Sequence, residues 1–557
     1  MSELLKRYLP RVDFDSYNDF FQNYAVNVPE GFNFGYDVVD EWARLEPEKE
    51  ALVWCSDDFK LERYTFADAK RLSDQAANVF KKFGIKKGDV VMLILKQRPM
   101  VWWCITALCK LGAVCIPGTF QLKPKDIVYR CNAAGIKMIV SVADDSIVNS
   151  IASVRKDCET LETIAYTDGF SSEGCPSFDT ELAAASEVLV REETNKATDP
   201  MLIYFSSGTS GMPKMALHDF TLPLGHIVTA KYWQHAQNNK IHMTQTDSGW
   251  AKFAWGKIYG QWICGSAIGA YDTDKFVPDM MLKAIQLIKP ATFCAPATIY
   301  RYLIKEDLSN ARFDFIQHAC MAGEPLNPEV FYQIEAKTGL RLHEGFGQSE
   351  GSVLLANFGW DEIKPGSTGK PAPLYNLKLL DENGQESADG ENGSICITGT
   401  DKRHPTGLFK YYYRDEAATK ACWQNGIYNT NDVAWRDADG YYWFVGRNDD
   451  VIKCSGYRIG PFEVESALLE HPSVLECAVT AAPDPMRGQV VKATIVLAKG
   501  FSSSPELTKE LQNHVKKVTA PYKYPRIVEY VEELPKTISG KIRRMEIRQK
   551  DIENSEK

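Results

Sequence analysis

Short apolar runs alternate with amphipathic stretches over most of the chain. The run 90–95 is apolar throughout, a helical pattern follows it at 100–114, and a second apolar run comes at 137–143. This alternation predicts βαβ units and parallel sheet. The same texture returns at 291–307 and 315–339, and we find no repeat of about 20–50 residues, the period of a solenoid. The main body of the chain is therefore expected to be α/β.

The texture changes after about Thr368. Segment 374–399 is typical of short strands joined by Asn-Gly and Asp-Gly turns, and a helix is expected from about Pro461. The tail is small, of mixed α/β pattern, and rich in Lys and Arg. We therefore predict three parts of the chain, namely an N-terminal domain over 1–447, a hinge at 448–450 and a C-terminal lid domain over 451–557.

Composition narrows the function classes. The 557 residues are too many for one hydrophobic core and indicate about two to four domains. The formal net charge is −9, which argues against a nucleic-acid partner, and no apolar run reaches the roughly 18 residues of a membrane span. The first 20 residues contain Glu3, Asp13, Asp15 and Asp19 and no apolar core, which argues against a secretory or mitochondrial presequence. We therefore expect a cytoplasmic protein whose 14 cysteines are reduced thiols.

The stretch YFSSGTSGMPKMALHDF, Tyr204–Phe220, has the composition of a loop that holds phosphate. Glycines let backbone N–H groups approach an anion, and hydroxyls and a lysine add donors and charge. A Walker A loop is excluded because Pro213 precedes Lys214, no Ser or Thr follows it, and the next residues resemble a strand. For the loop alone, a Gly/Ser surface turn remains an alternative.

Further segments follow the loop in order: DSGWAKFAWG (Asp247–Gly256), GEPL (Gly323–Leu326), EGFGQSE (Glu344–Glu350), YNTNDVA (Tyr428–Ala434), GRNDDVIKCSGYRIGPFEVE (Gly446–Glu465) and PKTISGKIRR (Pro535–Arg544). Together with the loop they resemble the adenylate-forming superfamily across nearly the whole chain. The C-terminal stretch VTAPYKYPR is most similar to medium-chain acyl-CoA synthetases. The resemblance implies an α/β fold: a large N-terminal domain of stacked mixed and parallel sheets with helices and a β-subdomain, and a small mobile α+β C-terminal domain.

The chemistry implied by the resemblance is the activation of a carboxylate, which is a poor electrophile. The acid would attack the α-phosphate of ATP to give an acyl-adenylate and pyrophosphate, and the thiol of coenzyme A would then displace AMP. Cations must stabilise the charge that builds on phosphate oxygens, and Mg²⁺ is implied. Two alternatives remain: an enzyme that loads a carrier-protein thiol, and a nucleotide-binding homologue without catalysis.

The resemblance assigns roles to residues of the nucleotide site. Glu350 would hold Mg²⁺, Asp432 and Arg447 would contact the ribose, and Arg458 and Lys541 would reach phosphate, so that Lys541, Glu350 and Arg458 are the expected catalytic groups. Phe346 would stack on adenine. The other expected ATP and AMP contacts are Ser206, Ser207, Gly208, Thr209, Ser210, Gly211, Met212, Pro213, Lys214, Gly323, Glu324, Pro325, Glu344, Gly345, Gly347, Gln348 and Ser349.

The resemblance also implies a path for coenzyme A and a moving joint. Asp449 matches the residue about which the small domain of the family rotates between the two half-reactions. A basic surface suits the phosphates of coenzyme A on an otherwise acidic protein, although for Lys516 alone an ordinary solvated lysine remains an alternative. The expected coenzyme A contacts are Ser455, Gly456, Tyr457, Arg487, Lys516, Tyr524, Pro525 and Arg526.

The acyl pocket is expected from the aromatic segment 249–262 and from Gly347. Its predicted wall residues are Trp250, Lys252, Phe253, Trp255 and Gly347, while Trp262 is equally well an ordinary core residue. Lys252 would reach solvent or a polar group of the acid. A glycine at 347 is expected to leave empty volume for an acyl chain, which predicts short-to-medium acids of about four carbons or more, with branched and aryl acids among the candidates. A glycine that serves only the backbone turn remains the alternative for this position.

One residue departs from the family pattern in a way that concerns backbone conformation. Asn431 replaces the glycine of the usual Thr-Gly-Asp sequence, which reads Thr-Asn-Asp here. Asn tolerates positive φ better than other residues with a side chain. We therefore expect the turn to be preserved.

Overall fold

The computed structural model describes residues 3–192, 195–206, 212–309, 311–454, 457–484, 487–536 and 542–555. The chain divides into two compact units, each considered by itself below. The first unit comprises Met1–Asn376 and Gly399–Gly426, and the second comprises Leu377–Thr398 and Ile427–Lys557. This division groups the β-rich segment after residue 376 with the C-terminal part, whereas the sequence placed that segment in the N-terminal domain. The hinge at 448–450 stays a prediction.

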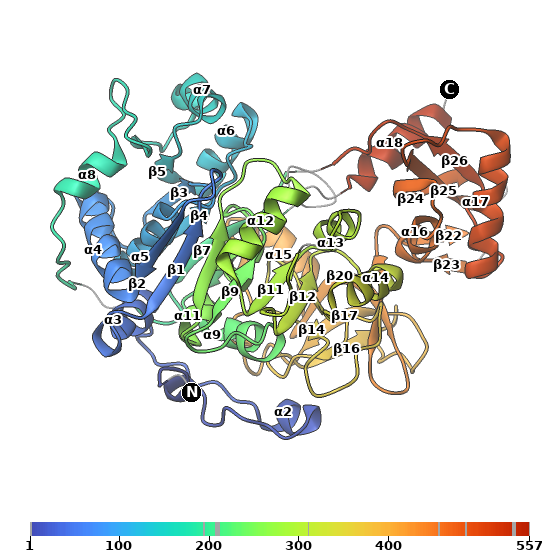
Figure 1. The fold of residues 1–557 in the computed structure, drawn as a ribbon, viewed down its shortest axis with the longest axis horizontal. Coiled ribbons are helices and arrows are strands. Elements are labelled where there is room, and N and C mark those ends of the chain that lie inside the picture. Colours follow the sequence, from blue (N-terminus) through green and yellow to red (C-terminus); the bar gives the residue numbers. More distant parts are fainter. Residues whose placement is uncertain are drawn as a thin grey trace. The chain divides into compact units, whose positions relative to one another are not determined.

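The first unit contains two mixed sheets (Figure 1). Sheet 1 has the order β15-β14-β13-β12-β11-β9-β10-β1-β2, and sheet 2 has the order β18-β8-β7-β4-β3-β5-β6. The strands of sheet 1 are β1 (Glu50–Cys55), β2 (Leu61–Thr65), β9 (Ile241–Thr244), β10 (Ala267–Tyr271), β11 (Thr292–Ala295), β12 (His318–Ala322), β13 (Leu342–Phe346), β14 (Leu355–Ala356) and β15 (Lys370–Pro371). Those of sheet 2 are β3 (Val90–Ile94), β4 (Val114–Pro117), β5 (Ile136–Ser141), β6 (Thr163–Tyr166), β7 (Pro200–Ser206), β8 (Lys214–Asp219) and β18 (Tyr411–Tyr412).

Parallel pairing dominates the middle of both sheets, as the alternating pattern predicted. Every residue of β3 is buried, which explains why this strand is apolar on both faces. The main helices around the two sheets are α4 (Phe66–Lys82), α5 (Met100–Leu111), α6 (Pro124–Ala134), α7 (Asp145–Val154), α8 (Phe178–Ala184), α9 (Leu222–Ile227), α10 (Lys252–Gly256), α11 (Tyr259–Ile263), α12 (Pro278–Ile288), α13 (Ala297–Leu303), α14 (Pro328–Thr338) and α15 (Glu416–Cys422). The predicted mixed α/β architecture is confirmed.

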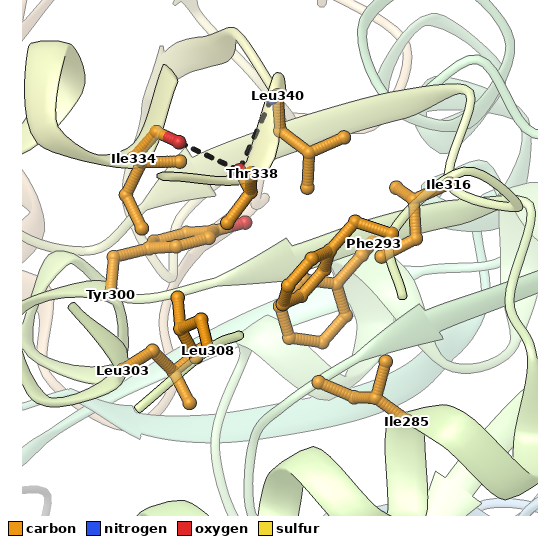
Figure 2. Close-up of a pocket in the computed structure, with 10 residues that line it drawn as sticks. Ile285, Phe293, Tyr300, Leu303, Leu308, Ile316, Ile334, Thr338 and Leu340 are labelled. Atoms are coloured by element: carbon orange, nitrogen blue, oxygen red, sulfur yellow. Dashed lines mark hydrogen bonds between the residues drawn. The ribbon is translucent and has the colours of Figure 1, made fainter. Parts of the chain in front are cut away.

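A small apolar cavity lies among β11 and helices α12, α13 and α14 (Figure 2). Its volume is about 10 Å³. It is lined by Ile285, Phe293, Tyr300, Leu303, Leu308, Phe313, Ile316, Ile334, Thr338 and Leu340. The Thr338 hydroxyl donates to the Ile334 carbonyl at 2.7 Å and so presents no free donor to this cavity. A cavity of this size and lining is a packing defect of the core and does not hold an organic substrate.

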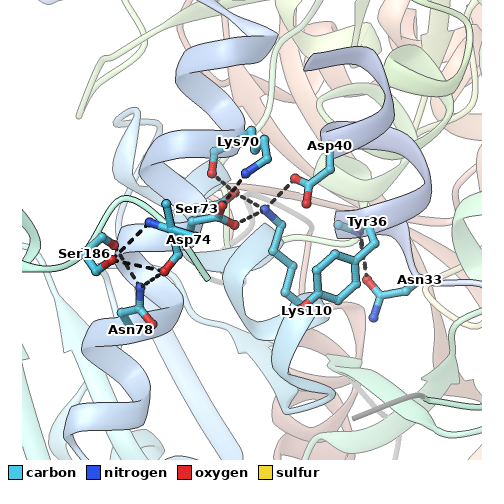
Figure 3. A network of polar contacts seen from close by, with 11 residues as sticks. Asn33, Tyr36, Asp40, Lys70, Ser73, Asp74, Asn78, Lys110 and Ser186 are labelled. Carbon is cyan, nitrogen blue, oxygen red and sulfur yellow. Dashed lines mark hydrogen bonds and ion pairs between the residues drawn. The ribbon is translucent and has the colours of Figure 1, made fainter. Parts of the chain in front are cut away.

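A buried ammonium group ties the N-terminal segment to α4 and α5 (Figure 3). The side chain of Lys110 is fully buried, and its Nζ lies 2.6 Å from Asp40 and 2.6 Å from Asp74. Ser73 accepts from the same Nζ at 2.9 Å. Asp74 also pairs with Lys70 at 2.6 Å. Because a buried charge is tolerated only when it is paired, this network requires the segment around Asp40 to stay docked on the two helices.

Three histidine rings stack at the start of β12 and β13. The ring of His318 lies 4.0 Å from that of His235 and 4.0 Å from that of His343. Burial lowers the pKa of His235 and of His343 to about 4 and holds that of His318 well below its usual value. The three rings are therefore neutral at neutral pH, when their close stacking carries no charge repulsion.

The second unit contains one small sheet of β16 (Leu377–Leu380), β17 (Gly393–Thr398), β20 (Ile427–Arg436) and β21 (Tyr442–Arg447). A further sheet follows in the order β23-β22-β25-β24, with β26 paired to β25. Its elements are β22 (Ile452–Cys454), β23 (Tyr457–Ile459), α16 (Pro461–Leu469), β24 (Val474–Asp484), β25 (Gly488–Leu497), α17 (Pro505–Val518), β26 (Ile527–Tyr530) and α18 (Arg544–Ser555). The short strands expected at 374–399 and the helix expected from Pro461 are thus present.

Candidate active site

The predicted phosphate loop joins the two strands of a β-hairpin. β7 and β8 are antiparallel, and Ser206 at the end of β7 pairs with Lys214 at the start of β8. The prediction that Lys214 begins a strand is confirmed. Ser207, Gly208, Thr209, Ser210 and Gly211 lie outside the described residues. Met212 is exposed, and the carbonyl of Pro213 accepts from the Tyr129 hydroxyl at 2.8 Å, which anchors the loop on α6.

Glu350 and Lys214 both contact Tyr412, which was not among the residues predicted from the sequence. The hydroxyls of Ser206 and Tyr412 both donate to Oε1 of Glu350, at 3.2 and 2.9 Å. The Nζ of Lys214 lies 5.0 Å from the centroid of the Tyr412 ring. The arrangement places a carboxylate, a cation and two hydroxyls at the end of the hairpin where Ser206 pairs with Lys214. Tyr412 was missed because it is one of three successive tyrosines, and only the pairing of β18 with β8 distinguishes it.

The buried side chain of His218 holds the backbone next to Glu350. The Nε2 of His218 lies 2.8 Å from the carbonyl oxygen of Ser349, next to Glu350. Burial lowers the pKa of His218 to about 4, so the ring is neutral and acts as a hydrogen-bond donor to that carbonyl. The backbone N–H of Phe409 donates to the carbonyl of Glu350 at 2.7 Å. The carboxylate therefore rests on a backbone that is fixed on both sides.

The segment Gly323–Pro325 follows β12 and offers backbone rather than side chains to a ligand. Gly323 has φ +106° and nothing within 4 Å of the position of a Cβ. The carboxylate of Glu324 is engaged by Thr298 at 2.7 Å and by Arg301 at 3.0 Å. The side chain of Glu344 is buried and accepts from the N–H of Leu326, and burial raises its pKa well above the usual value. Glu344 thus holds this segment from inside.

Phe346 ends β13 half-buried, and Gln348 is also half-buried. Gly345 borders Trp233, because a Cβ at 345 would lie 2.5 Å from atoms of that indole. The roles predicted for Phe346, Gln348 and Ser349 at the nucleotide stay predictions. What the structure adds is that β13 leads these residues to the same edge of sheet 1 as Gly323, which follows the neighbouring parallel strand.

The aromatic segment predicted for the acyl pocket separates into core and boundary residues. Phe253 is buried, and its ring centroid lies 5.3 Å from that of Trp102. Trp262 is fully buried, and its Nε1 donates to the Ala51 carbonyl at 2.9 Å. Trp262 is therefore a core residue. The Nζ of Lys252 donates to the Ala322 carbonyl at 2.6 Å, beside Gly323, instead of reaching solvent as the sequence analysis allowed. Trp250 is half-buried.

The volume expected beside Gly347 is not empty, which corrects one prediction. A Cβ at position 347 would lie 2.7 Å from Cζ2 of Trp255, and closer still to Cη2. Trp255 is 6% exposed, and its Nε1 donates to the Gly351 carbonyl at 3.1 Å. An indole from α10 fills the space that the missing side chain leaves, and residue type at position 347 alone does not reveal this neighbour. Trp255, which was among the predicted wall residues, therefore covers Gly347.

In the second unit, Asp432 and Arg447 stand opposite each other on β20 and β21. Asp432 is buried. The Nε of Arg447 is buried and has no hydrogen-bond partner within the described part of the chain. A buried guanidinium donor without an acceptor is costly, so this atom is suited to an oxygen of a ligand. The two residues predicted for the ribose are thus brought together, and one of them has an unused donor.

The turn before Asp432 is preserved as expected, since Asn431 has φ +62°. Its side chain does more than tolerate the turn. The Nδ2 of Asn431 donates to the carboxylate of Asp449, the predicted hinge residue, at 2.9 Å. The N–H of Asn448 donates to the Asn431 carbonyl at 2.9 Å, and Arg548 contacts the Asp449 carbonyl at 3.1 Å. Hydrogen bonds therefore hold both the backbone and the side chain of the predicted hinge.

Three of the residues predicted for coenzyme A form one basic cluster around an aromatic ring. The Nζ of Lys516 lies 4.0 Å from the centroid of Tyr524, and the guanidinium of Arg526 lies 4.9 Å from it. Arg526 also donates to the Tyr524 hydroxyl at 2.8 Å. The exposed ring of Tyr457 stacks on that of Tyr522, with 4.1 Å between the ring centroids. The carbonyl of Pro525 accepts a hydrogen bond from Gln512 at 2.9 Å. The backbone N–H of Arg487 donates to the carboxylate of Asp484 at 2.8 Å.

Two predicted catalytic groups and two predicted coenzyme A contacts are not placed. Ser455, Gly456 and Lys541 lie outside the described residues, and so does the side chain of Arg458, whose backbone pairs with Lys453. Within the described ranges, no group of His, Cys, Asp and Glu side chains is arranged to hold a metal ion. A single carboxylate such as Glu350 is nevertheless a usual Mg²⁺ ligand when substrate phosphates complete the coordination. The fit of Glu350 to Mg²⁺ thus depends on bound nucleotide.

Comparison with known proteins identifies the family. Residues 39–413 match the family model described as AMP-binding enzyme, and residues 463–541 match the model described as AMP-binding enzyme C-terminal domain. The chain belongs to the AMP-binding enzymes. The first match alone spans more than half of the 557 residues and covers the hairpin, Glu350 and Tyr412.

The relatives at full length are medium-chain acyl-CoA synthetases, as the resemblance predicted. The chain is 40% identical to acyl-coenzyme A synthetase ACSM3 of Mus musculus over 97% of this chain and 94% of the relative. It is 42% identical to acyl-coenzyme A synthetase ACSM4 of Homo sapiens over 94% of this chain and 91% of the relative. These relatives confirm the predicted enzyme class, an AMP-forming ligase that joins an acid to a thiol.

Solved structures agree with this family. An anthranilate CoA ligase in complex with anthranoyl-AMP matches with a TM-score of 0.87 and 27% identity, covering 95% of this chain and 99% of the other. An acyl-CoA synthetase of Brucella canis matches with a TM-score of 0.74 and 30% identity, covering 97% and 100%. The predicted fold class is therefore confirmed over nearly the whole chain.

The predicted cytoplasmic location is wrong by the same comparison. The acyl-coenzyme A synthetases of mouse and human to which the chain is similar are mitochondrial proteins. The prediction rested on the composition of the first 20 residues, which is a weaker guide than likeness along the whole chain. In the part of the chain that the structure describes, no helix has the length and apolar character needed to cross a bilayer.

Proposed function

We propose that the protein converts short-to-medium-chain carboxylic acids into acyl-CoA thioesters in two half-reactions, and that it does so in mitochondria. In the first, the acid attacks the α-phosphate of ATP, giving an acyl-adenylate and pyrophosphate. In the second, the thiol of coenzyme A attacks the acyl carbonyl and AMP leaves. The observation that carries the proposal is the corner at which Ser206 and Tyr412 both hydrogen-bond to Glu350, with Lys214 on the tyrosine ring.

The chain's own residues have distinct tasks in this proposal. Lys214 and the hairpin loop bind the phosphates, and Glu350 would hold Mg²⁺ together with the nucleotide. Mg²⁺, when bound with ATP, neutralises charge on phosphate oxygens during the first half-reaction. Asp432 and the unused Nε donor of Arg447 bind ribose oxygens. Arg458 and Lys541 reach phosphate.

The second half-reaction requires a binding path for coenzyme A. The cluster of Lys516, Tyr524 and Arg526 combines two cations with an aromatic ring, and this combination suits a phosphorylated purine nucleotide. Ser455, Gly456 and Tyr457 line the pantetheine passage. Asp449 is the hinge that presents first Lys541 and then this passage. On the acyl side, Trp255 and Trp250 bound the acid.

A turnover assay with a panel of carboxylates tests the proposal. Pyrophosphate release that needs acid and ATP, followed by AMP and thioester formation that needs free coenzyme A, is the expected result. Pyrophosphate release without thioester formation from free coenzyme A would direct the function toward a carrier-protein thiol. No acid-dependent pyrophosphate release from any member of the panel would overturn the proposal.

A further inference from the structure

Tyr412 contacts two groups of opposite charge, Lys214 and Glu350. The Lys214 ammonium lies over its ring at 5.0 Å, and its hydroxyl donates to Glu350 at 2.9 Å. Tyr412 is 6% exposed and Glu350 is 7% exposed. The contact that the structure gives the Lys214 ammonium within the described residues is with the Tyr412 ring, and no ion pair is found for it there. A lysine and a glutamate this near each other in a partly dry corner would otherwise attract strongly.

The thiol of Cys422 is influenced by the charges of both Lys214 and Glu350. Both Lys214 and Glu350 act electrostatically on the thiol of Cys422, the lysine lowering its pKa and the glutamate raising it, although burial is the largest effect and raises the pKa to about 11. Both charges are therefore near Cys422 in the first unit, and Tyr412 contacts both of them.

The backbone of Tyr412 is fixed as firmly as its side chain. Tyr412 pairs with Ala216 of β8, and its N–H donates to the Thr419 hydroxyl at 3.0 Å. The ring of Phe409 packs 5.0 Å away. These contacts with Ala216, Thr419 and Phe409 restrict movement of Tyr412. It is therefore a rigid spacer.

The two hydroxyls also determine which carboxylate oxygen is available. Ser206 and Tyr412 both donate to Oε1 of Glu350, and no described residue donates to Oε2. A carboxylate with one oxygen occupied by two donors keeps a single orientation, and its second oxygen is left to bind a cation.

We propose that Tyr412 is a positioning residue that keeps Lys214 and Glu350 from pairing with each other, so that the lysine is available to phosphate and Oε2 of the glutamate to the divalent cation bound with the nucleotide. The proposal rests on the proposed function, because it takes Glu350 as the metal-binding carboxylate. The ring performs the separation, and the hydroxyl performs the orientation. These two contributions can be removed one at a time.

The test compares Tyr412→Phe, Tyr412→Leu, Glu350→Gln and the control Tyr411→Phe, which makes the same change at an exposed neighbour. Two binding constants are measured. One is the Kd of Mn²⁺, followed by electron paramagnetic resonance, in the presence of an ATP analogue with a methylene bridge between the α- and β-phosphorus. The other is the Kd of that analogue in EDTA, without metal. Melting temperatures verify that each variant is folded.

Tyr412→Phe is expected to weaken Mn²⁺ binding about tenfold, the usual effect of losing one hydrogen bond to a charged group, and to leave the metal-free nucleotide affinity within twofold of wild type. Tyr412→Leu is expected to weaken both, because Lys214 then pairs with Glu350. Tyr411→Phe is expected to change neither. A merely structural role would not produce this division between the Phe and Leu variants.

Two results would overturn the inference in different ways. If Glu350→Gln weakens Mn²⁺ binding while Tyr412→Phe and Tyr412→Leu bind Mn²⁺ and nucleotide as wild type does, the metal site stands and the role of Tyr412 is wrong. If Glu350→Gln itself leaves Mn²⁺ binding unchanged, the metal assignment in the proposed function fails, and the inference built on it fails with it.

Discussion

Gly347 and Trp255 are packed so closely that a single added methyl group is expected to have a measurable effect. The Cβ of Gly347→Ala would lie 2.7 Å from Cζ2 of Trp255 and 2.9 Å from the Ser352 carbonyl, whereas ordinary contact begins at 3.4 Å. Overpacking of this kind costs about 1–3 kcal/mol. Displacing the indole would also strain its hydrogen bond to Gly351, which contributes about 0.5–1.5 kcal/mol. We therefore expect the free energy of unfolding of the first unit to fall by about 1.5–4.5 kcal/mol.

A second substitution separates this steric effect from a general sensitivity of the turn. In Trp255→Leu the indole is gone, so the added methyl group of Gly347→Ala loses its clash with Trp255 and keeps only the close contact with the Ser352 carbonyl. The double variant should then show a coupling free energy of about 1–3 kcal/mol, in the range measured for residues in contact. Calorimetric melting of the four proteins measures the cycle.

The same four proteins test acid specificity. If Trp255 bounds the acyl chain, Trp255→Leu should gain activity toward longer acids, by about fourfold for each additional methylene that becomes buried. The activity of Trp255→Leu toward acetate or propionate should not increase. Additive melting-temperature changes in the double variant, together with an unchanged acid profile for Trp255→Leu, would refute the packing argument and remove Trp255 from the specificity question.

Three further outcomes are expected. Lys541→Ala should lower acyl-adenylate formation by about 10²-fold or more and leave thioester formation from supplied acyl-adenylate largely intact; equal losses would contradict that division of labour. Asp449→Pro fixes φ and also removes the acceptor of Asn431, so adenylation should persist while thioester formation fails, and Asp449→Asn is the milder control. Burial lowers the pKa of His235 and His343 from 6.5 to about 4, so the unfolded chain binds protons at a higher pH than the folded chain does. The free energy of unfolding is therefore highest above pH 6.5 and falls as the pH falls toward about 4. The first unit should therefore weaken by about 1.4 kcal/mol per pH unit for each neutral ring, and denaturation of His235→Asn between pH 7 and 5 should show a shallower slope.

The sequence predicted those parts of the protein that depend on local pattern and on motif order. Parallel strands, the hairpin around the phosphate loop and the positive φ of Asn431 follow from residue type and spacing. The contacts of Tyr412 could not be predicted in the same way, because β18 is only two residues long and reaches β8 from almost 200 residues away. Trp255 and Gly347 were both selected from the sequence. That the indole fills the space beside the glycine depends on how α10 packs against the segment that follows β13. Side-chain interlocking of this kind has no periodic signature.

The buried Lys110 network bears on how the protein could be shortened or recombined with a relative. The family match begins at residue 39, yet Asn33 lies before it and donates to the Cys109 carbonyl at 2.7 Å and to Asn195 at 2.8 Å. A chain trimmed to residue 39 would keep Asp40 but lose the anchor that holds this aspartate's segment against α5. A chimera that exchanged α5 alone would place a foreign residue opposite Asp40 and Asp74. The unit of exchange is therefore segment 33–45 together with α4 and α5, and this unit begins before residue 39, where the family match starts.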